Sequence, residues 1–331
     1  MKLSIVTTLY RSAETIDEFY RRTMAAAASF PYEVELVLVN DGSPDDSLDR
    51  ALALHRADMR VVVVDLARNF GHHRAMMTGL LHARGDLVFL LESDLEEEPE
   101  LLAQFHQRLM QGDCDVVYGV QEKRRGNLFQ RAPGRLFFFL VELLSDPPLP
   151  RNLATVRLMT RDYVRALVRH RDREFLIGHL CQLSGFRQVP LAIRKLSCSP
   201  TTYSLWRRID MAVKHVTTTS TKLLYITLYS GIAIWGLSAI VVLYYLGRYL
   251  ISGIPVDGFT SLITSIWFFG GLITLILGVH GVYIANILSE TKRRPYTVVR
   301  RVHRTDAVAA AGPDIIRVPG PGQRLDPSAR Q

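Results

Sequence analysis

The chain has 331 residues, of which 48% are hydrophobic and 22% charged, and its formal net charge is +8. So large an apolar fraction excludes disorder as the main state and allows a substantial core. Its three cysteines lie far apart without metal-ligand spacing, which excludes a disulfide framework. The basic residues cluster beside long apolar segments, so we exclude a nucleic-acid partner and expect membrane lipids nearby.

The first half of the chain alternates short β-rich runs with helical patterns. It enters the first run directly, without the apolar stretch of a signal peptide, so we expect this part to remain in the cytoplasm. Such alternation predicts an α/β fold with a mostly parallel sheet covered by helices. The predicted strands are residues 3–8, 33–39, 60–66, 86–91 and 115–120.

Polar residues follow four of these predicted strands. In open sheets of this kind, ligands bind in the crevice at the carboxyl ends of the strands, so these residues are candidates for a site. The sequence has no Gly-x-Gly-x-x-Gly turn after the first strand and no phosphate-loop motif, which excludes a dinucleotide dehydrogenase and a P-loop nucleotidase. The candidates are Thr8 and Tyr10, Asp41, residues 68–71 and residues 92–94.

Glu92 and Asp94 stand two residues apart after an apolar run, so in an extended chain both carboxylates project to one side. Carboxylate oxygens suit Mg²⁺ or Mn²⁺, which can also bind phosphate oxygens. The alternative is that residues 92–100 form the acidic beginning of a helix, where carboxylates favour the positive end of the dipole. For residues 96–98 we favour this alternative.

Two long uncharged segments follow, residues 223–247 and 258–289. Each exceeds the roughly 20 residues that a helix needs to cross a membrane. The loop between them holds one Arg and one Asp, whereas both outer flanks are strongly basic, which predicts a hairpin with both termini in the cytoplasm. Before it, apolar residues recur at helical spacing over residues 201–222 and predict an amphipathic helix on the membrane.

These patterns divide the chain into four parts. Small residues in the uncharged segments permit close helix packing, so a homo-oligomer is compatible with the sequence. The parts are a cytoplasmic α/β domain over residues 1–200, the amphipathic helix over 201–222, the transmembrane hairpin over 223–289, and a basic cytoplasmic segment with a disordered Pro/Gly-rich tail over 290–331.

A set of motifs, taken in order, resembles one known family. They are similar to those of polyprenyl-phosphate glycosyltransferases of the family-2, GT-A type, which include dolichyl-phosphate mannose synthases and bacterial undecaprenyl-phosphate sugar transferases. The resemblance covers residues 3–300. Its motifs are Val39-Asn40-Asp41-Gly42-Ser43, Arg68-Asn69-Phe70-Gly71-His72, Gly85-Asp86, and Glu92-Ser93-Asp94-Leu95 with Pro99-Glu100, followed by a basic segment and two spans.

The resemblance implies a Rossmann-like GT-A domain and a role for several residues. Asp41 would bind the nucleotide base, and Asp94, together with Glu92, the divalent metal on the diphosphate. The nucleotide pocket would be lined by Thr8, Tyr10 and Ser12. Basic residues ahead of the apolar run 136–144 would receive the acceptor phosphate, or else be solvated or lipid-facing charges. They include Arg124, Arg131 and Arg135.

The chain departs from the family's motifs at several positions. The usual Asp-x-Asp is Glu92-Ser93-Asp94, so the first carboxylate is one methylene further from the backbone. The bacterial Gly-Asp-Phe-Arg is Ala154-Thr155-Val156-Arg157, so a catalytic base at Thr155 is not expected, while Arg157 remains to orient or neutralise phosphate. In addition, Ser-Lys-Tyr-Ser is replaced by residues 201–204, and a proline of the first strand by Thr8.

Together, the residues and the resemblance predict a multi-pass enzyme of the inner or plasma membrane. It would transfer a sugar from a nucleotide-diphosphate sugar to a polyprenyl phosphate, with inversion, for cell-envelope glycan or lipid modification. Asp94, Glu92 and Arg157 would serve catalysis. The alternative is a non-catalytic membrane-anchored scaffold that binds a nucleotide sugar.

Overall fold

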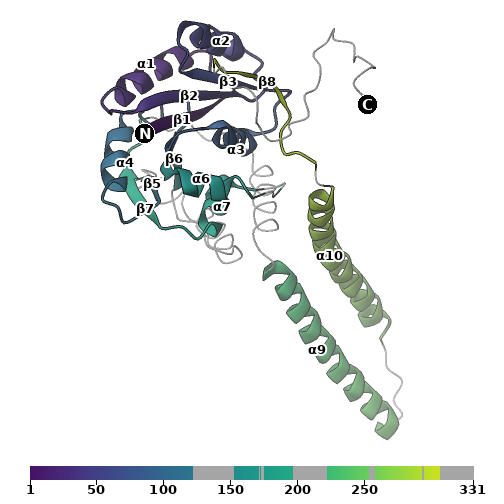
Figure 1. Cartoon of the computed structure of the whole chain (residues 1–331). Coiled ribbons are helices and arrows are strands. Elements are labelled where there is room, and N and C mark those ends of the chain that lie inside the picture. Colours follow the sequence, from purple (N-terminus) through teal and green to yellow (C-terminus); the bar gives the residue numbers. More distant parts are fainter. Residues whose placement is uncertain are drawn as a thin grey trace, which may run out of the picture. The chain divides into compact units, whose positions relative to one another are not determined.

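A computed structural model describes residues 1–121, 153–170, 172, 175–196, 222–252, 258–292 and 294–305. The chain divides into two compact units. One contains all eight strands and the helices that pack on them, and the other contains the two longest helices, α9 and α10 (Figure 1). The predictions for Arg124, Arg131 and Arg135, for residues 201–221 and for the tail after residue 305 concern residues outside the described ranges.

The first unit begins with the predicted alternation of strands and helices. All five predicted strands are present within two residues of the expected bounds, because each is a Val- and Leu-rich run that is buried on both faces of the sheet. In order they are β1 (Lys2–Leu9), α1 (Ile16–Ala27), β2 (Glu33–Asn40), α2 (Ser47–Ala57), β3 (Val61–Leu66), α3 (His72–His82), β4 (Leu87–Leu90), α4 (Leu101–Leu109) and β5 (Val116–Gln121).

Further strands and two short helices complete this unit. The elements are β6 (Leu153–Thr160), α6 (Arg161–Leu167), α7 (Ile177–Leu183), β7 (Gln188–Ile193) and β8 (Val299–His303). The strand order is β7-β5-β6-β4-β1-β2-β3-β8. The sheet is mixed, because β6 runs antiparallel to both β4 and β5, and β8 runs antiparallel to β3. The predicted α/β class is confirmed, with fewer parallel pairs than the alternation alone indicated.

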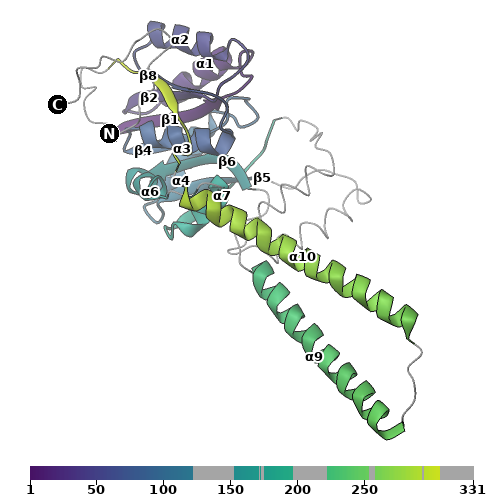
Figure 2. The same ribbon diagram turned by 90° about the vertical axis from the view of Figure 1, so that its right-hand side faces the viewer.

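Strand β8 was not predicted, because its sequence Val-Arg-Arg-Val-His is short and charged. It pairs with β3 through Val63↔His303 to Leu66↔Val299 and forms one edge of the sheet, which Figure 2 shows in yellow. Arg300 of β8 lies 3.6 Å from the buried carboxylate of Asp65. Part of the segment that the sequence assigned to a basic region after the hairpin is therefore a strand of the α/β sheet.

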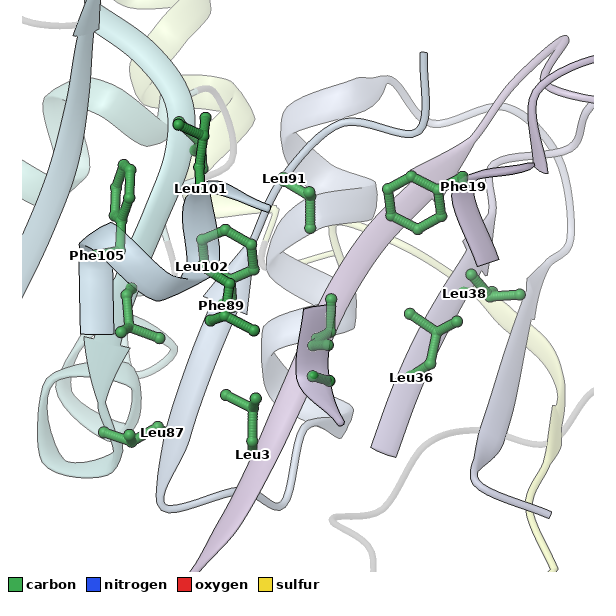
Figure 3. Close-up of a cluster of buried hydrophobic side chains, with 14 of the residues drawn as sticks. Leu3, Phe19, Leu36, Leu38, Leu87, Phe89, Leu91, Leu101, Leu102 and Phe105 are labelled. Carbon is green, nitrogen blue, oxygen red and sulfur yellow. The ribbon is translucent and has the colours of Figure 1, made fainter. Parts of the chain in front are cut away.

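Apolar side chains pack on both faces of the sheet. Alternation along β2 sends Leu36 and Leu38 to one face and Val37 and Val39 to the other. The first face is covered by α1, α2 and α4, and Figure 3 shows its cluster with Phe19, Phe89 and Phe105 among the leucines. The second face is covered by α3, α6 and α7. Two buried layers hold the strands in register, which fixes where the strands end.

The preferred interpretation of residues 96–98 as the acidic beginning of a helix is wrong. Helix α4 begins at Leu101, and its first turn contains no acidic residue. Residues 93–97 form turns and bends between β4 and α4. Glu97 is fully buried, with 0% of its surface exposed, so it is part of the packed structure of this loop.

The second unit consists of α9 (Lys222–Ser252) and α10 (Phe259–Thr291), the two long helices of Figure 2. Both cover the uncharged segments predicted to cross a membrane. Among the described residues, one stretch is long and apolar enough for a span, Phe268–Thr291, with a mean hydropathy of 1.9. Only 6% of its most apolar 18-residue window is buried inside the protein, whereas the core helix of a soluble protein is mostly buried.

Candidate active site

The carboxyl ends of β1, β2, β3 and β4 meet at one edge of the sheet, because these four strands pair in parallel. The predicted polar residues lie together there. The Thr8 hydroxyl is 3.0 Å from His72 Nδ1, and His72 Nε2 is 3.3 Å from Glu92 Oε1. The expectation that several strand ends converge is confirmed by these contacts.

Asp41 is almost completely buried, with 2% of its surface exposed. Its carboxylate accepts hydrogen bonds from the backbone N–H groups of Phe70 (2.7 Å) and Gly71 (3.0 Å). Gly42 makes this approach possible: its φ is +59°, and a Cβ there would lie 2.5 Å from the backbone of Arg68. Burial raises the pKa of Asp41 despite the two N–H groups. The two N–H groups thus hold the carboxylate in place at the end of β2.

The other predicted nucleotide-pocket residues lie on the loop after β1. Tyr10 is 47% exposed, whereas Ser12 is buried. The Ser12 backbone N–H donates to Ser47 Oγ, and its hydroxyl lies 3.1 Å from that of Ser93. Arg11 has a φ of 56°, an unusual value for a residue with a side chain. Tyr10 is thus available to a ligand, while Ser12 connects three loops at the rim of the site.

Asp45 is the centre of a second set of bonds at this rim. It accepts hydrogen bonds from the hydroxyls of Ser43 and Ser47 and from the backbone N–H of Ala13. Burial alone would raise its pKa, but these bonds outweigh burial and lower the pKa to about 2. Sequence reasoning missed this residue, although an Asp two positions before a predicted helix is a common turn signal.

Replacing Asp45 with asparagine is expected to destabilise the protein in a pH-dependent way. The pKa of Asp45 is lowered on folding, so its bonds contribute stability above its ordinary pKa of 3.8, and this contribution is lost as the pH falls towards 2. Thermal unfolding midpoints should therefore differ most between wild type and Asp45→Asn above pH 4 and converge below it. A difference independent of pH would contradict this assignment.

Glu92 accepts two hydrogen bonds at the same oxygen. Thr155 Oγ1 donates to Glu92 Oε1 at 2.6 Å, and His72 Nε2 lies 3.3 Å from that atom. Burial alone would raise the pKa of Glu92, but the hydrogen bonds of His72 and Thr155, together with the charge of Lys195, lower it to about 2. Glu92 is therefore a fixed anion at neutral pH. The two departures from the family's motifs, at positions 92 and 155, are in direct contact.

Asp94 lies in the turn after β4 and is exposed, whereas Glu92 is partly buried. Its Oδ1 accepts a hydrogen bond from the backbone N–H of Glu96 at 3.0 Å. Leu95 has a φ of 62°, a strained conformation for a branched residue that costs about 1–3 kcal/mol and turns the chain sharply after Asp94. Partial desolvation of its carboxylate raises the pKa of Asp94, as do the charges of Glu92 and Glu96.

Arg157, predicted to act on phosphate, lies on β6 with 2% of its surface exposed. Its guanidinium donates to the carbonyls of Ala154 and Thr155 and to the thiol of Cys181. Within the described part of the chain it forms no ion pair with a carboxylate. The structure therefore places a buried positive charge against the backbone carbonyl of Thr155, bonded to protein groups.

A divalent cation fits the acidic residues of this edge. Within residues 1–121 and the other described ranges, no cluster of three or more His, Cys, Asp or Glu side chains could bind a metal by itself. Mg²⁺ and Mn²⁺ bound with a diphosphate need only one or two protein carboxylates, because phosphate oxygens and water complete the shell. The exposed carboxylate of Asp94, with anionic Glu92 nearby, provides such a donor set.

Glu97 and Lys195 also belong to this edge, and sequence reasoning missed both as parts of the site. Glu97 Oε1 accepts the backbone N–H of Thr155 at 3.1 Å and lies 3.3 Å from Lys195 Nζ. Burial raises the pKa of Glu97, against the charge of Lys195. No local signal marks Lys195, since it is 98 residues away in the sequence. The sequence indicated His72 only as the last residue of the motif that begins at Arg68.

The fold and this edge define an α/β domain whose carboxylates gather at the ends of parallel strands, as in enzymes that bind charged substrates there. The model of the family "Glycosyl transferase family 2" matches residues 4–168. The chain belongs to this family and is a glycosyltransferase.

Curated relatives match over nearly the whole chain. A Mycobacterium tuberculosis protein described as "Putative glycosyltransferases" is 44% identical over 306 residues, 92% of this chain and 90% of that one. The "SfII prophage-derived bactoprenol glucosyl transferase" of Shigella flexneri is 30% identical, covering 92% and 99%. The "Prophage bactoprenol glucosyl transferase homolog" of Escherichia coli K12 is also 30% identical, covering 92% and 100%. The predicted family is thereby confirmed.

Proposed function

We propose that this glycosyltransferase moves a sugar from a nucleotide-diphosphate sugar to a polyprenyl phosphate, with inversion at the anomeric carbon. The observation that supports this most is that anionic Glu92 and exposed Asp94 follow β4 at the same edge of the sheet as Asp41 and Tyr10. Two relatives named as bactoprenol glucosyl transferases, matched over nearly their full length, favour a lipid phosphate as acceptor.

Different residues of this edge would bind different parts of the nucleotide-diphosphate sugar. Asp41 and Tyr10 would contact the nucleoside, with Thr8 and Ser12 holding the loops around it. Asp94 would bind Mg²⁺ or Mn²⁺, with Glu92 as the neighbouring anion. When bound, this cation neutralises charge on the departing diphosphate, which lowers the barrier to leaving. The chain's own contribution is to fix Asp94 at the strand end through Leu95 and the backbone of Glu96.

The acceptor can attack without a protein base. A phosphate monoester has its second pKa near 6, so it is largely dianionic at neutral pH. Its oxygen forms a bond to the anomeric carbon while the bond from that carbon to the diphosphate breaks, and the nucleoside diphosphate leaves. Thr155 is then free to donate to Glu92, as observed. The N–H groups of Arg157 are bonded to a carbonyl and a thiol of the protein. Arg157 would therefore act on the substrate through its positive charge and not through a direct hydrogen bond.

The connection between the two units supports a two-span hairpin. Strands β7 and β8 belong to one sheet, so the chain leaves that sheet after residue 193 and returns to it at residue 299. A segment that starts and ends on the same side must cross a membrane an even number of times. If Phe268–Thr291 of α10 crosses, α9 is the other long helix that the described residues contain between these two strands. The basic flanks favour a cytoplasmic catalytic domain and cytoplasmic termini.

Inverted membrane vesicles test this function and its orientation together. Vesicles containing the full chain would be incubated with polyprenyl phosphate and a panel of labelled nucleotide sugars. We expect labelled lipid from at least one sugar, and only when the sugar faces the former cytoplasmic surface. Product in right-side-out vesicles alone would contradict the orientation. Binding of a nucleoside diphosphate without any labelled lipid would favour the non-catalytic scaffold.

A further inference from the structure

Four carboxylates crowd the end of β4 and the loop after it: Glu92, Asp94, Glu96 and Glu97. Glu97 is buried, and Glu92 and Glu96 are partly buried, so water screens the repulsion among these charges only in part. The ammonium group of Lys195 lies against this group. Lys195 Nζ is 3.3 Å from Glu97 Oε1 and 3.5 Å from Glu96 Oε2.

The pair of Lys195 with Glu97 is shielded from water. The Glu97 side chain is 0% exposed and that of Lys195 is 19% exposed. A buried carboxylate needs a partner, because taking an isolated charge out of water is costly. Glu97 Oε2 has no hydrogen-bond partner in the described part of the chain. The carboxylate is therefore stabilised through Oε1, which contacts both Lys195 Nζ and the backbone N–H of Thr155.

Backbone contacts attach the same loop to the end of β7. The Leu196 N–H donates to the Glu96 carbonyl at 3.1 Å, directly beside the ion pairs of Lys195. Glu97 also accepts the N–H of Thr155 on β6. The segment that follows Asp94 is therefore joined to two strands, β6 and β7, that are remote in sequence. Lys195 is the charged part of this junction.

We propose that Lys195 is the built-in counter-ion of this acidic loop, and that Lys195 and Glu97 are positioning residues that hold the loop of Asp94 ready for a divalent cation. This inference rests on the proposed function in one respect, the assignment of the cation to Asp94. Without Lys195, Glu97 loses the ammonium group that pairs with it, and the repulsion among the neighbouring carboxylates is less well compensated. A divalent cation at Asp94 then supplies part of the missing charge, so it stabilises such a variant more than it stabilises the wild type.

The test compares metal-dependent stabilisation of the full chain purified in detergent. Thermal unfolding midpoints would be measured in chelator and with Mn²⁺ alone for wild type, Lys195→Met, Lys195→Arg and Lys2→Met. The Lys2 variant is the matched control, because Lys2 Nζ pairs with buried Glu35 at 3.0 Å at the start of β1, the opposite end of the strand from the site.

We expect Lys195→Met to lower the midpoint in chelator by about 5 °C or more, since it removes the counter-ion of a buried carboxylate. Mn²⁺ should restore at least half of that loss, and Lys195→Arg should behave nearly as wild type. Lys2→Met should lower the midpoint equally with and without Mn²⁺. If Lys195→Met does not fold, the double variant Lys195→Met with Glu97→Gln replaces it, because this variant removes both charges of the buried pair. Mn²⁺ must still raise the unfolding midpoint of the double variant more than it raises that of Lys2→Met.

Equal responses of the Lys195 and Lys2 variants to Mn²⁺ would overturn the inference, whatever the activity of the wild type. A wild type that transfers no sugar, together with a Lys195 variant that Mn²⁺ rescues, would overturn the proposed function and support this inference. The two failures are therefore distinguishable.

Discussion

Replacing Asp94 with asparagine is expected to reduce kcat for sugar transfer by about 10²–10³-fold, the range seen when one group that stabilises transition-state charge is removed. Asparagine keeps an oxygen for the Glu96 N–H and nearly the same volume, so the turn at Leu95 can persist. What it loses is the negative charge that would bind the cation beside the diphosphate. The measurement is initial-rate kinetics with labelled nucleotide sugar at saturating lipid phosphate.

Asp162→Asn is the matched control for this variant. Asp162 lies in the first turn of α6, its side chain is 83% exposed, and its contact is a surface pair with Arg165. We expect its kcat to equal that of the wild type. Unfolding midpoints of both variants should lie close to the wild-type value. Transfer by Asp94→Asn at the wild-type rate would remove Asp94 from the site and with it the proposed role of the cation.

Thr155→Asp is expected to have the second large effect, a decrease in kcat/KM of about 100-fold. Thr155 Oγ1 donates to Glu92 Oε1 at 2.6 Å, and Glu92 stays ionised because its pKa is about 2. A carboxylate at position 155 would place a second negative charge at hydrogen-bond distance from Glu92, which pushes one of the two side chains out of place. Thr155→Ser keeps the donor and should retain most of the activity.

A double variant separates repulsion from loss of the hydroxyl. Adding Glu92→Gln to Thr155→Asp leaves one carboxylate in the pair and restores a donor and an acceptor. We expect the double variant to be more active than Thr155→Asp alone, which is strong non-additivity between neighbours. If the effect of the double variant on kcat/KM equals the product of the effects of Glu92→Gln and Thr155→Asp, then Glu92 and Thr155 do not act as a unit, despite their contact.

Several features could be predicted from the sequence because they depend on local patterns. The strands β1 to β5 are apolar runs bounded by turn residues, and the helices between them repeat apolar positions at helical spacing. Parallel strands must end at one edge, so Thr8, Asp41 and Glu92 were predicted to converge from spacing alone. The long uncharged segments likewise predicted α9 and α10.

Other features had no local signal. The chain around Glu97 has the composition of a helix beginning, yet Glu97 is buried because Lys195 and the backbone of Thr155 reach it from β7 and β6. Strand β8 is too charged to predict as a strand, and it exists because the edge of β3 offers unpaired backbone groups.

The sequence by itself determined the α/β class, the two long apolar helices, the family and the set of polar residues at the strand ends. These follow from periodicity, length and ordered motifs. Only the tertiary structure decided that Glu92 contacts Thr155, that Lys195 is the cation of the acidic loop, and that the chain returns from α10 into the sheet as β8. The physical reason is that buried charges and edge strands are stabilised by partners remote in sequence, which no local pattern records.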